Sequence, residues 1–225
     1  MTEVPKWGMV IDLFRCIGCH GCTYSCKAEN NTGRGVFWAR VFDYEVGKYP
    51  RVTRSFLPMP CMMCEDAPCE QACPSGATYR RKDGIVAVDA DKCVGCKTCM
   101  LACPYDARFM NSEEVYFDPA ESPRDRLRAS LRQPGAVEKC TFCKERIDRG
   151  LAQGLTPGSD WDATPACVNA CPANARVFGD LQDPDSEISR LIATHSAEPL
   201  RRELSTRPSV YYISASKPIQ RGEVG

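Results

Sequence analysis

The sequence has no long apolar run. None of its stretches approaches the roughly 20 consecutive apolar residues that a helix needs to cross a bilayer. Residues 1–7 are polar, contain Pro5 and show neither the basic nor the apolar segment of a secretory signal. We therefore expect a soluble chain with no signal peptide and no transmembrane segment of its own, so that any contact with a membrane is made through a partner.

Motifs for catalysis are also missing. The sequence shows no nucleophile–base arrangement, no phosphate-binding loop and no dinucleotide-binding glycine fingerprint, and it contains only two histidines. These absences argue against a substrate site, and we predict that the chain is not an enzyme by itself. Positive and negative side chains balance, with 29 of each, and we expect no nucleic-acid partner.

Cysteine and proline, by contrast, are abundant, with 16 and 17 in 225 residues. Cysteine at this density indicates disulfides, zinc sites or iron–sulfur clusters, and the spacing has to decide among them. All 16 fall into four blocks, and each block contains a pair spaced C-x3-C. The blocks are Cys16, Cys19, Cys22 and Cys26; Cys61, Cys64, Cys69 and Cys73; Cys93, Cys96, Cys99 and Cys103; and Cys140, Cys143, Cys167 and Cys171.

The third block is the clearest signal. Its spacing, C-x2-C-x2-C-x3-C followed by Pro104, is the bacterial ferredoxin pattern, in which three thiolates bind one cubane cluster and the fourth binds a neighbouring cluster. Sixteen thiolates around four cluster cores of charge +2 would add a charge of roughly −8. We therefore predict a multi-cluster iron–sulfur protein that is more acidic than its sequence suggests.

Two other uses of the cysteines compete with this interpretation. Paired C-x2-C hooks can also hold zinc, and four tetrahedral sites would use the same sixteen thiolates. Blocks one and three, however, add a third cysteine and a fourth at spacings that structural zinc sites do not require. A disulfide framework is less favoured still, because no signal peptide is visible and the chain is long enough to form a core. Structural zinc is kept as the remote alternative.

The repeated C-x3-C pair predicts how the blocks combine. Residues i and i+4 lie one turn apart on a helix, so the second cysteine of each pair points towards a different cluster. Two blocks then form one two-cluster unit, and four blocks form two such units in one body of the α+β class. If the adjacent blocks two and three pair, block one must pair with the split block four. We therefore expect one ferredoxin-like unit at 61–103 and another built from 1–60 plus 104–225.

Secondary structure is expected mainly between the blocks. We expect strands at 8–14, 36–46 and 52–57, the last two paired, from their β-branched and alternating apolar residues. Asp83-Gly84 indicates a hairpin within 78–88. Residues 104–139 read as a surface excursion with one short helix. Ser186 to His195 is typical of a capped amphipathic helix, with Ile188, Leu191 and Ile192 on one face, and 210–213 is expected to be a last strand.

Several charged residues adjoin the cysteines. His20 lies between two of them, but sixteen thiolates already complete four sites and leave no vacancy for an imidazole, so we do not expect it to be a ligand. Near the end of a predicted helix, His195 is expected to be a surface residue. Five lysines are each next to a cysteine, either as solvated surface residues or as cations that offset cluster charge: Lys27, Lys92, Lys97, Lys139 and Lys144. For Lys97, inside a cluster loop, we favour the second role.

With the four blocks identified, the chain resembles the iron–sulfur electron-transfer subunits of DMSO reductase-family molybdopterin oxidoreductases. That family includes partners of polysulfide, thiosulfate, tetrathionate and arsenate reductases and of sulfite dehydrogenases. The resemblance extends from Gly8 to about Ile213. It rests on the segments CIGCHGCTYSCKAEN, PCMMCEDAPCEQACPSGA, DKCVGCKTCMLACPYDARF, EKCTFC and PACVNACPANARVFGDL.

The resemblance implies four 4Fe-4S clusters with shared ligand sets. The first cluster would be held by Cys16, Cys19, Cys22 and Cys171, and the second by Cys26, Cys140, Cys143 and Cys167. The third would be held by Cys61, Cys64, Cys69 and Cys103, and the fourth by Cys73, Cys93, Cys96 and Cys99. In the nitrate reductase relatives the residue that matches Cys96 is tryptophan and the fourth cluster has three irons, so the cysteine here implies a complete cubane.

The resemblance also implies partners. The first cluster would face a large catalytic subunit that carries the molybdopterin, and the fourth would face a membrane-anchored, quinone-reactive subunit. The complex would lie at the cytoplasmic face or, by co-export with a partner, in the periplasm. The alternative is a free-standing polyferredoxin that shuttles electrons between separate enzymes. Inserts between blocks one and two and after block three exceed what cluster binding needs and favour a docked subunit.

Overall fold

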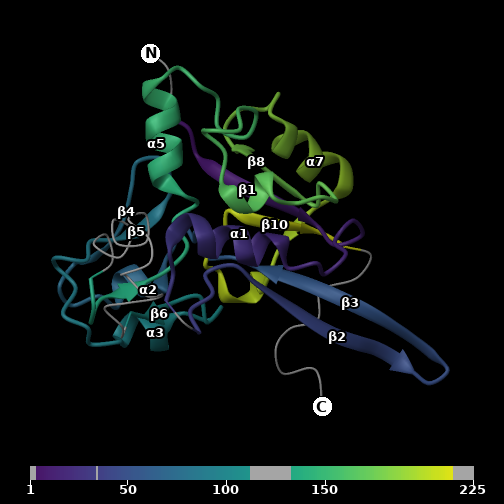
Figure 1. The fold of residues 1–225 in the computed structure, drawn as a ribbon, viewed down its shortest axis with the longest axis horizontal. Coiled ribbons are helices and arrows are strands. Elements are labelled where there is room, and N and C mark those ends of the chain that lie inside the picture. Colours follow the sequence, from purple (N-terminus) through teal and green to yellow (C-terminus); the bar gives the residue numbers. More distant parts are fainter. Residues whose placement is uncertain (1–3, 34, 112–132, 215–225) are drawn as a thin grey trace, which may run out of the picture.

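The computed structural model describes residues 4–33, 35–111 and 133–214, drawn as ribbon in Figure 1. Helices and strands are mixed along the chain and form several small sheets, which agrees with the expected α+β class. Most of the interval 104–139, where one short helix is expected, lies outside the described residues, since these omit 112–132. None of the described helices has the length and apolar character that crossing a membrane requires.

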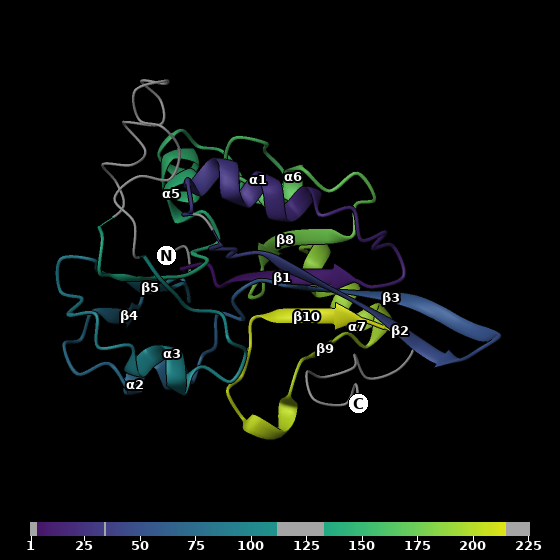
Figure 2. The same ribbon diagram turned by 60° about the horizontal axis from the view of Figure 1, so that its bottom comes forward.

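A four-stranded sheet joins the two ends of the chain. Its order is β8 (Arg176–Asp180), β1 (Trp7–Asp12), β10 (Val210–Ile213) and β9 (Glu198–Pro199). β1 pairs antiparallel with β8 and parallel with β10, and Figure 2 shows the three strands side by side. The strands predicted at 8–14 and 210–213 are confirmed, while β8 was not expected. Pairing of β1 with β10 places the C-terminal third of the chain against its beginning.

Helices cover this sheet. On one side lies α7 (Glu187–His195), which packs against β8, β1 and β10. Ile188 of α7 is fully buried beside Val10 and Ile213, so the predicted amphipathic helix is confirmed. On the other side lie α1 (Gly21–Asn30) and the short α6 (Ala166–Asn169), which contact each other (Figure 2).

A long hairpin projects from the body of the protein (Figure 1). It consists of β2 (Arg40–Lys48) and β3 (Arg51–Met59), paired antiparallel over their full length. The predicted pairing is confirmed, but β2 begins four residues after the expected 36. The alternating residues of 36–46 suggested a half-buried strand. This holds near the base, where Phe42 and Tyr44 are partly buried against the core, but not towards the tip, where Val46 is exposed.

Smaller elements occupy the middle of the chain. The helices are α2 (Pro68–Gln71), α3 (Thr98–Ala102) and α5 (Lys144–Ala152), with a 3-10 turn, η1 (Arg202–Leu204). β4 (Thr78–Arg80) pairs with β5 (Val86–Val88), as predicted for the hairpin at Asp83-Gly84. β6 (Phe109–Met110) pairs with β7 (Val137–Glu138). Contacts between α2 and α3 hold this region together.

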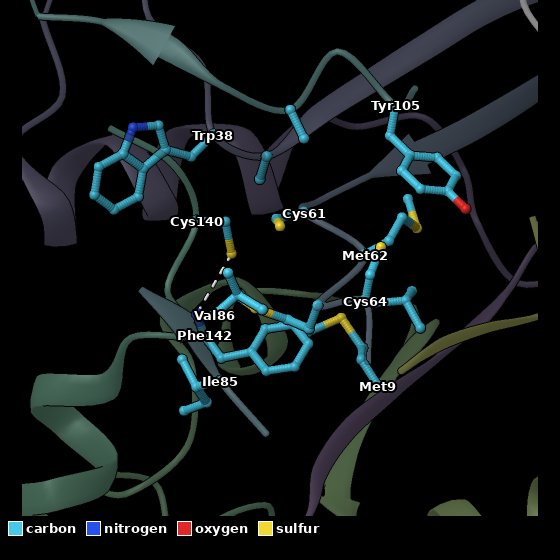
Figure 3. Close-up of a cluster of buried hydrophobic side chains, with 14 of the residues drawn as sticks. Met9, Trp38, Cys61, Met62, Cys64, Ile85, Val86, Tyr105, Cys140 and Phe142 are labelled. Carbon is cyan, nitrogen blue, oxygen red and sulfur yellow. Dashed lines mark hydrogen bonds between the residues drawn. The ribbon is translucent and has the colours of Figure 1, made fainter. Parts of the chain in front are cut away.

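The main core is unusual because cysteines are part of it. Nine of the 16 cysteines are buried, and eight of them share one apolar cluster with Met9, Trp38, Met62, Ile85 and Phe142 (Figure 3). Residues from the beginning, middle and end of the chain thus meet around sulfur atoms. The main apolar core therefore contains about half of the cysteines.

The cap of α7 provides a test of the fold away from the cysteines. Ser186 Oγ accepts a hydrogen bond from the N–H of Ser189 at 3.2 Å and donates one to the carbonyl of Asp180 at 2.7 Å. We predict that Ser186→Ala lowers the local unfolding free energy of α7 by about 1 kcal/mol, measured as faster amide hydrogen exchange in that helix. Ser186→Asp, which can still cap, and Ser189→Ala, which keeps the backbone donor, serve as controls. Equal exchange in Ser186→Ala and the parent protein would contradict the assigned cap.

Candidate metal centres

The four C-x3-C pairs share one local structure. In each block the first cysteine of the pair is the second residue of a helix, namely Cys22 of α1, Cys69 of α2, Cys99 of α3 and Cys167 of α6. Its partner lies one turn further, which is inside α1 for Cys26 and at or just beyond the helix end for Cys73, Cys103 and Cys171. The i, i+4 helix geometry used in the sequence argument is therefore complete in α1, whereas the other three helices end before the second cysteine.

The C-x2-C loops that precede α1 and α3 depend on a positive backbone dihedral. In the loop of block three, Gly95 has φ 67°, and a Cβ built there would lie 2.6 Å from the carbonyl oxygen of Gly135. Only glycine permits both the conformation and this close approach. The loop is thus shaped by its own residue and by a distant segment of the chain.

One group of cysteines lies entirely within the buried core. We call Cys26, Cys140, Cys143 and Cys167 group 2; all four are buried. Burial raises the pKa of Cys26 well above its usual value, and the nearby charges of Cys140, Cys167 and Cys143 raise it further. Asn30 Nδ2 lies 3.6 Å from Cys26 Sγ and 3.8 Å from Cys143 Sγ. Thiols from three separate parts of the sequence are therefore close enough to act on one another.

A second group lies at the surface near α1 and α6. Cys16, Cys19, Cys22 and Cys171, called group 1, line a single pocket. The pKa of Cys16 is raised by burial, lowered by a hydrogen bond from the Gly18 backbone, and raised by the charges of Cys22 and Cys171. The N–H of Ala175 lies 3.3 Å from Cys171 Sγ. Cys19 is exposed, so this group is open to solvent on one side.

Blocks two and three contribute the other two groups. Cys61, Cys64, Cys69 and Cys103 form group 3. Burial raises the pKa of Cys64 to about 12, and the charge of Cys61 is the next largest cause. The charges of Cys69 and Cys103 also raise this pKa, by smaller amounts. The three cysteines of block two in this group are buried, while Cys103 is partly exposed.

Group 4 consists of Cys73, Cys93, Cys96 and Cys99. The charge of Cys73 acts on Cys96, while Cys93 receives the N–H of Val137 at 3.4 Å. Although burial opposes it, hydrogen bonds from Thr78 and Ser75 lower the pKa of Cys73 to about 7. The hydroxyl of Thr98 lowers the pKa of Cys96, which is exposed. Cys73 and Cys96 thus favour the thiolate form, and the group, like group 1, reaches the surface at an exposed cysteine.

Electrostatic effects connect group 1 with group 2, group 2 with group 3, and group 3 with group 4. Cys22 of group 1 acts electrostatically on Cys167 of group 2, and Cys61 of group 3 acts on Cys140 of group 2. Figure 3 shows Cys61 and Cys140 in the same buried cluster. Groups 3 and 4 are linked by Arg108, whose charge is stabilised by Cys69, Cys99 and Cys61. The exposed cysteines belong to the first and last of these groups.

The lysines next to the cysteines differ from one another in burial, which bears on the two roles that the sequence left open for them. Lys139 is 2% exposed, and its ammonium donates to the carbonyl of Cys140 at 2.7 Å. Lys27 donates to the carbonyl of Thr32 at 2.9 Å and so fastens the loop after α1. Neither is a solvated surface lysine, whereas Lys97, favoured for a role in charge compensation, is exposed. His20 precedes α1 in a left-handed conformation.

Two arginines escaped the sequence analysis. Arg108 and Arg176 are both 3% exposed and lie beside cysteines of neighbouring groups. A signal for them exists, because each ends the sequence Cys-Pro-x-x-Ala-Arg, once at 103–108 and once at 171–176. The repeat places an arginine at the same distance after a shared cysteine in both halves of the chain.

The geometry of the groups also bears on the type of metal site. A single tetrahedral zinc ion needs four ligand atoms about 2.0–2.3 Å from one point. Among the residues that the structure describes, no group of three or more His, Cys, Asp or Glu side chains could hold one metal ion.

Comparisons with known proteins follow the same division of the chain. Residues 52–133 match the family described as a 4Fe-4S dicluster domain, and residues 13–33 match a 4Fe-4S binding domain. The first match spans blocks two and three, and the second covers block one.

Similar proteins are known from archaea and bacteria. The chain is 44% identical to the iron–sulfur subunit of a putative dimethyl sulfoxide reductase of Halobacterium salinarum, over 94% of this chain and 80% of that protein. It is 40% identical to one of the subunits of selenate reductase from Mesobacillus selenatarsenatis, over 93% and 72%. It is 38% identical to the arsenate respiratory reductase iron–sulfur subunit of a Shewanella species, over 92% and 96%.

The loop glycine of block three gives a test of the site. We predict that Gly95→Ala lowers bound iron by roughly a quarter, because one of the four cysteine blocks would lose its loop. Gly76→Ala is the matched control, since Gly76 has a similar φ of 64° but nothing within 4 Å of the added Cβ. Iron analysis of anaerobically prepared variants measures the effect. If both variants kept full iron, the close approach to Gly135 would have no part in shaping the site.

Proposed function

The chain belongs to the family of iron–sulfur subunits of multi-subunit oxidoreductases, and we propose that it carries four 4Fe-4S clusters in a line. As in that family, it is an electron-transfer subunit and not the catalytic one. One observation carries the proposal: cysteines from all four blocks act on one another electrostatically, with buried thiols at the centre and exposed ones at Cys19 and Cys96, which supports four sites in a row. Such an arrangement suits a conductor that receives electrons at one surface and delivers them at another.

The proposed ligand sets are the four cysteine groups. The first cluster is held by group 1, the second by group 2, the third by group 3 and the fourth by group 4. Support comes from the pocket that contains all four cysteines of group 1 and from the mutual charge effects within groups 2 and 3. N–H groups directed at Cys73, Cys93 and Cys171 fit thiolates that accept hydrogen bonds.

We propose that the two-cluster units are crossed in sequence. One unit comprises 61–103, and the other comprises 1–60 together with 104–225. The contact of α2 with α3 joins blocks two and three, and the contact of α1 with α6 joins blocks one and four. The pairing of β1 with β10 supports the same closure of the two chain ends.

The protein's own residues shape the path of the electrons. A 4Fe-4S cluster supplies reversible one-electron chemistry at a potential set by its charge, hydrogen bonds and exposure. Burial of groups 2 and 3 keeps water from the middle of the line, which strengthens every electrostatic contact there. Exposure of Cys19 and Cys96 leaves the two ends accessible to partner proteins.

We propose a different partner for each end. The end with group 1 faces a large catalytic subunit that carries molybdopterin, and the end with group 4 faces a membrane-anchored, quinone-reactive subunit. Large apolar side chains are exposed in the cysteine segments of both ends, Phe14 and Ile17 at one and Val94 and Leu101 at the other. Exposed apolar patches rimmed by polar residues mark protein interfaces. The membrane is thus reached through the second partner.

A free-standing polyferredoxin is less well supported. The relatives are named as subunits of reductases, and Leu101 is 90% exposed next to the outermost group. A shuttle that meets many partners gains nothing from a fixed apolar contact, whereas a permanent subunit does. The subunit interpretation therefore stands.

The function can be tested by purification of the native complex. We predict roughly sixteen iron and sixteen acid-labile sulfide per chain, together with a co-purifying large chain that contains molybdenum. Zinc analysis of the same sample is the control. Iron that saturates at half this content would reject four clusters, and a chain that purifies alone with full iron would favour the polyferredoxin.

Cys96 allows the fourth site to be tested alone. We predict that Cys96→Trp converts this cluster to a three-iron form, because one thiolate ligand is removed from group 4, and leaves the other three unchanged. Electron paramagnetic resonance of the oxidised protein should then show a new signal, since oxidised low-potential cubanes are silent. The matched variant is Cys19→Trp, which removes the exposed cysteine of group 1 and should alter the first cluster instead. A signal that is identical in both variants would refute the two ligand sets.

A further inference from the structure

Two buried arginines hold equivalent positions in the two halves of the protein. Arg108 and Arg176 each follow a shared cysteine by five residues in the repeat Cys-Pro-x-x-Ala-Arg. Each comes at the edge of a strand, just before β6 and at the start of β8. Each is 3% exposed. The sequence repeat is thus matched by a repeat of burial and position.

Arg176 lies between groups 1 and 2. Its Nη1 is 3.7 Å from Cys167 Sγ and 3.6 Å from Met9 Sδ. Among the described residues, Nη2 has no hydrogen-bond acceptor. Electrostatically, its charge is stabilised by Cys167 and by Cys22, which belong to different groups. The guanidinium therefore lies between the first two sites. Its Nη2 is left without an acceptor among the described residues.

Arg108 occupies the corresponding junction between groups 3 and 4. Its Nη1 donates to Thr78 Oγ1 at 3.0 Å, and the guanidinium also interacts with the sulfur of Cys69. Within the part of the chain that the structure describes, Nε and Nη2 have no partner at full hydrogen-bond geometry. Cys69 and Cys61 of group 3 and Cys99 of group 4 stabilise its charge. Both ends of the line thus contain a buried guanidinium with donors to spare.

Such donors are costly if they stay unused. A buried N–H without an acceptor loses the hydrogen bonds that it made in water, and the loss is larger for a charged group. Sulfur is the acceptor type that both junctions have in common, from the cysteines and, with clusters bound, from their inorganic sulfide. The unsatisfied nitrogens therefore point to contacts that are completed when the clusters are present.

On the basis of the proposed function, we propose that Arg108 and Arg176 are bridging residues. Each donates hydrogen bonds to the sulfur of the two clusters at its junction and raises the reduction potentials of both. A positive charge and N–H···S bonds favour the reduced, more negative form of a cluster. Because one guanidinium acts on two clusters, the two potentials move together and the step between them stays small.

Lys139 shows that the middle junction is arranged differently. It is buried next to Cys140, and its charge also acts on Cys69, so it lies between groups 2 and 3. Its ammonium already contacts the carbonyls of Val86 and Cys140 and the sulfur of Met63. An ammonium has three donors, so none is left for a cluster. Lys139 supplies charge alone, whereas the two arginines supply charge and donors.

Redox titrations of the native complex, followed by electron paramagnetic resonance, test the proposal. We expect Arg176→Gln to lower the potentials of the first and second clusters, each by about 59 mV, which corresponds to a tenfold change in a one-electron equilibrium. The potentials of clusters three and four should stay unchanged. Arg108→Gln should lower the potentials of clusters three and four and leave those of clusters one and two unchanged. The lysine variants Arg176→Lys and Arg108→Lys keep the charge but lose the planar donors, and we expect smaller shifts in the same pairs.

Arg81→Gln is the matched control, since Arg81 is partly buried and pairs with Asp83 and Asp148; it should move no potential. Iron and sulfide are measured first, and a parent protein without clusters would reject the proposed function and not this inference. With clusters present, unchanged potentials, or a shift of only one cluster of the pair, would overturn the bridging role. If a glutamine variant failed to assemble, its lysine variant decides. Lower reduction potentials of both clusters at that junction support the proposal, and unchanged potentials reject it.

Discussion

The negative charge of thiolates buried in an apolar core is the constraint on which this structure depends. Isolated charges in such a place are very costly, and burial accordingly raises the pKa of Cys140 to about 12. Metal binding requires the deprotonated thiol, so the free energy of binding is coupled to folding. The buried Arg108, Lys139 and Arg176 supply opposite charge within the same core. Core packing and cofactor binding are for this reason a single problem in this protein.

Local patterns predicted local structure well. Ser186 with its apolar face gave the limits of α7 to within one residue, and Asp83-Gly84 located the β4–β5 hairpin, because helix caps and tight turns are determined by neighbours in sequence. The α+β class followed from the mixture of such elements. By contrast, the alternating residues of 36–46 suggested burial that the tip of the β2–β3 hairpin lacks, since alternation alone cannot show whether another element covers a strand.

The spacing of the cysteines was the part of the sequence from which candidate metal sites could be predicted. Cysteine pairs at C-x2-C and C-x3-C, together with the family resemblance, were enough to state four ligand sets. Arg108 and Arg176 were not found, because an arginine in a sequence looks like a surface residue and its partners come from distant segments. Thr78, for example, is thirty residues from Arg108. The repeat around them becomes meaningful only when burial is known.

Strand β1 pairs with strand β10, and Cys16 and Cys171 belong to the same proposed ligand set. Both links determine the order in which the sites are completed during synthesis. On the proposed ligand sets, all cysteines of the third and fourth sites have been made once the ribosome has passed residue 103. The first two sites stay incomplete until Cys167 and Cys171 emerge, shortly before the strands that close the sheet. Cofactor insertion can thus begin at the centre of the nascent chain, and a truncated chain could retain at most the half that was made first.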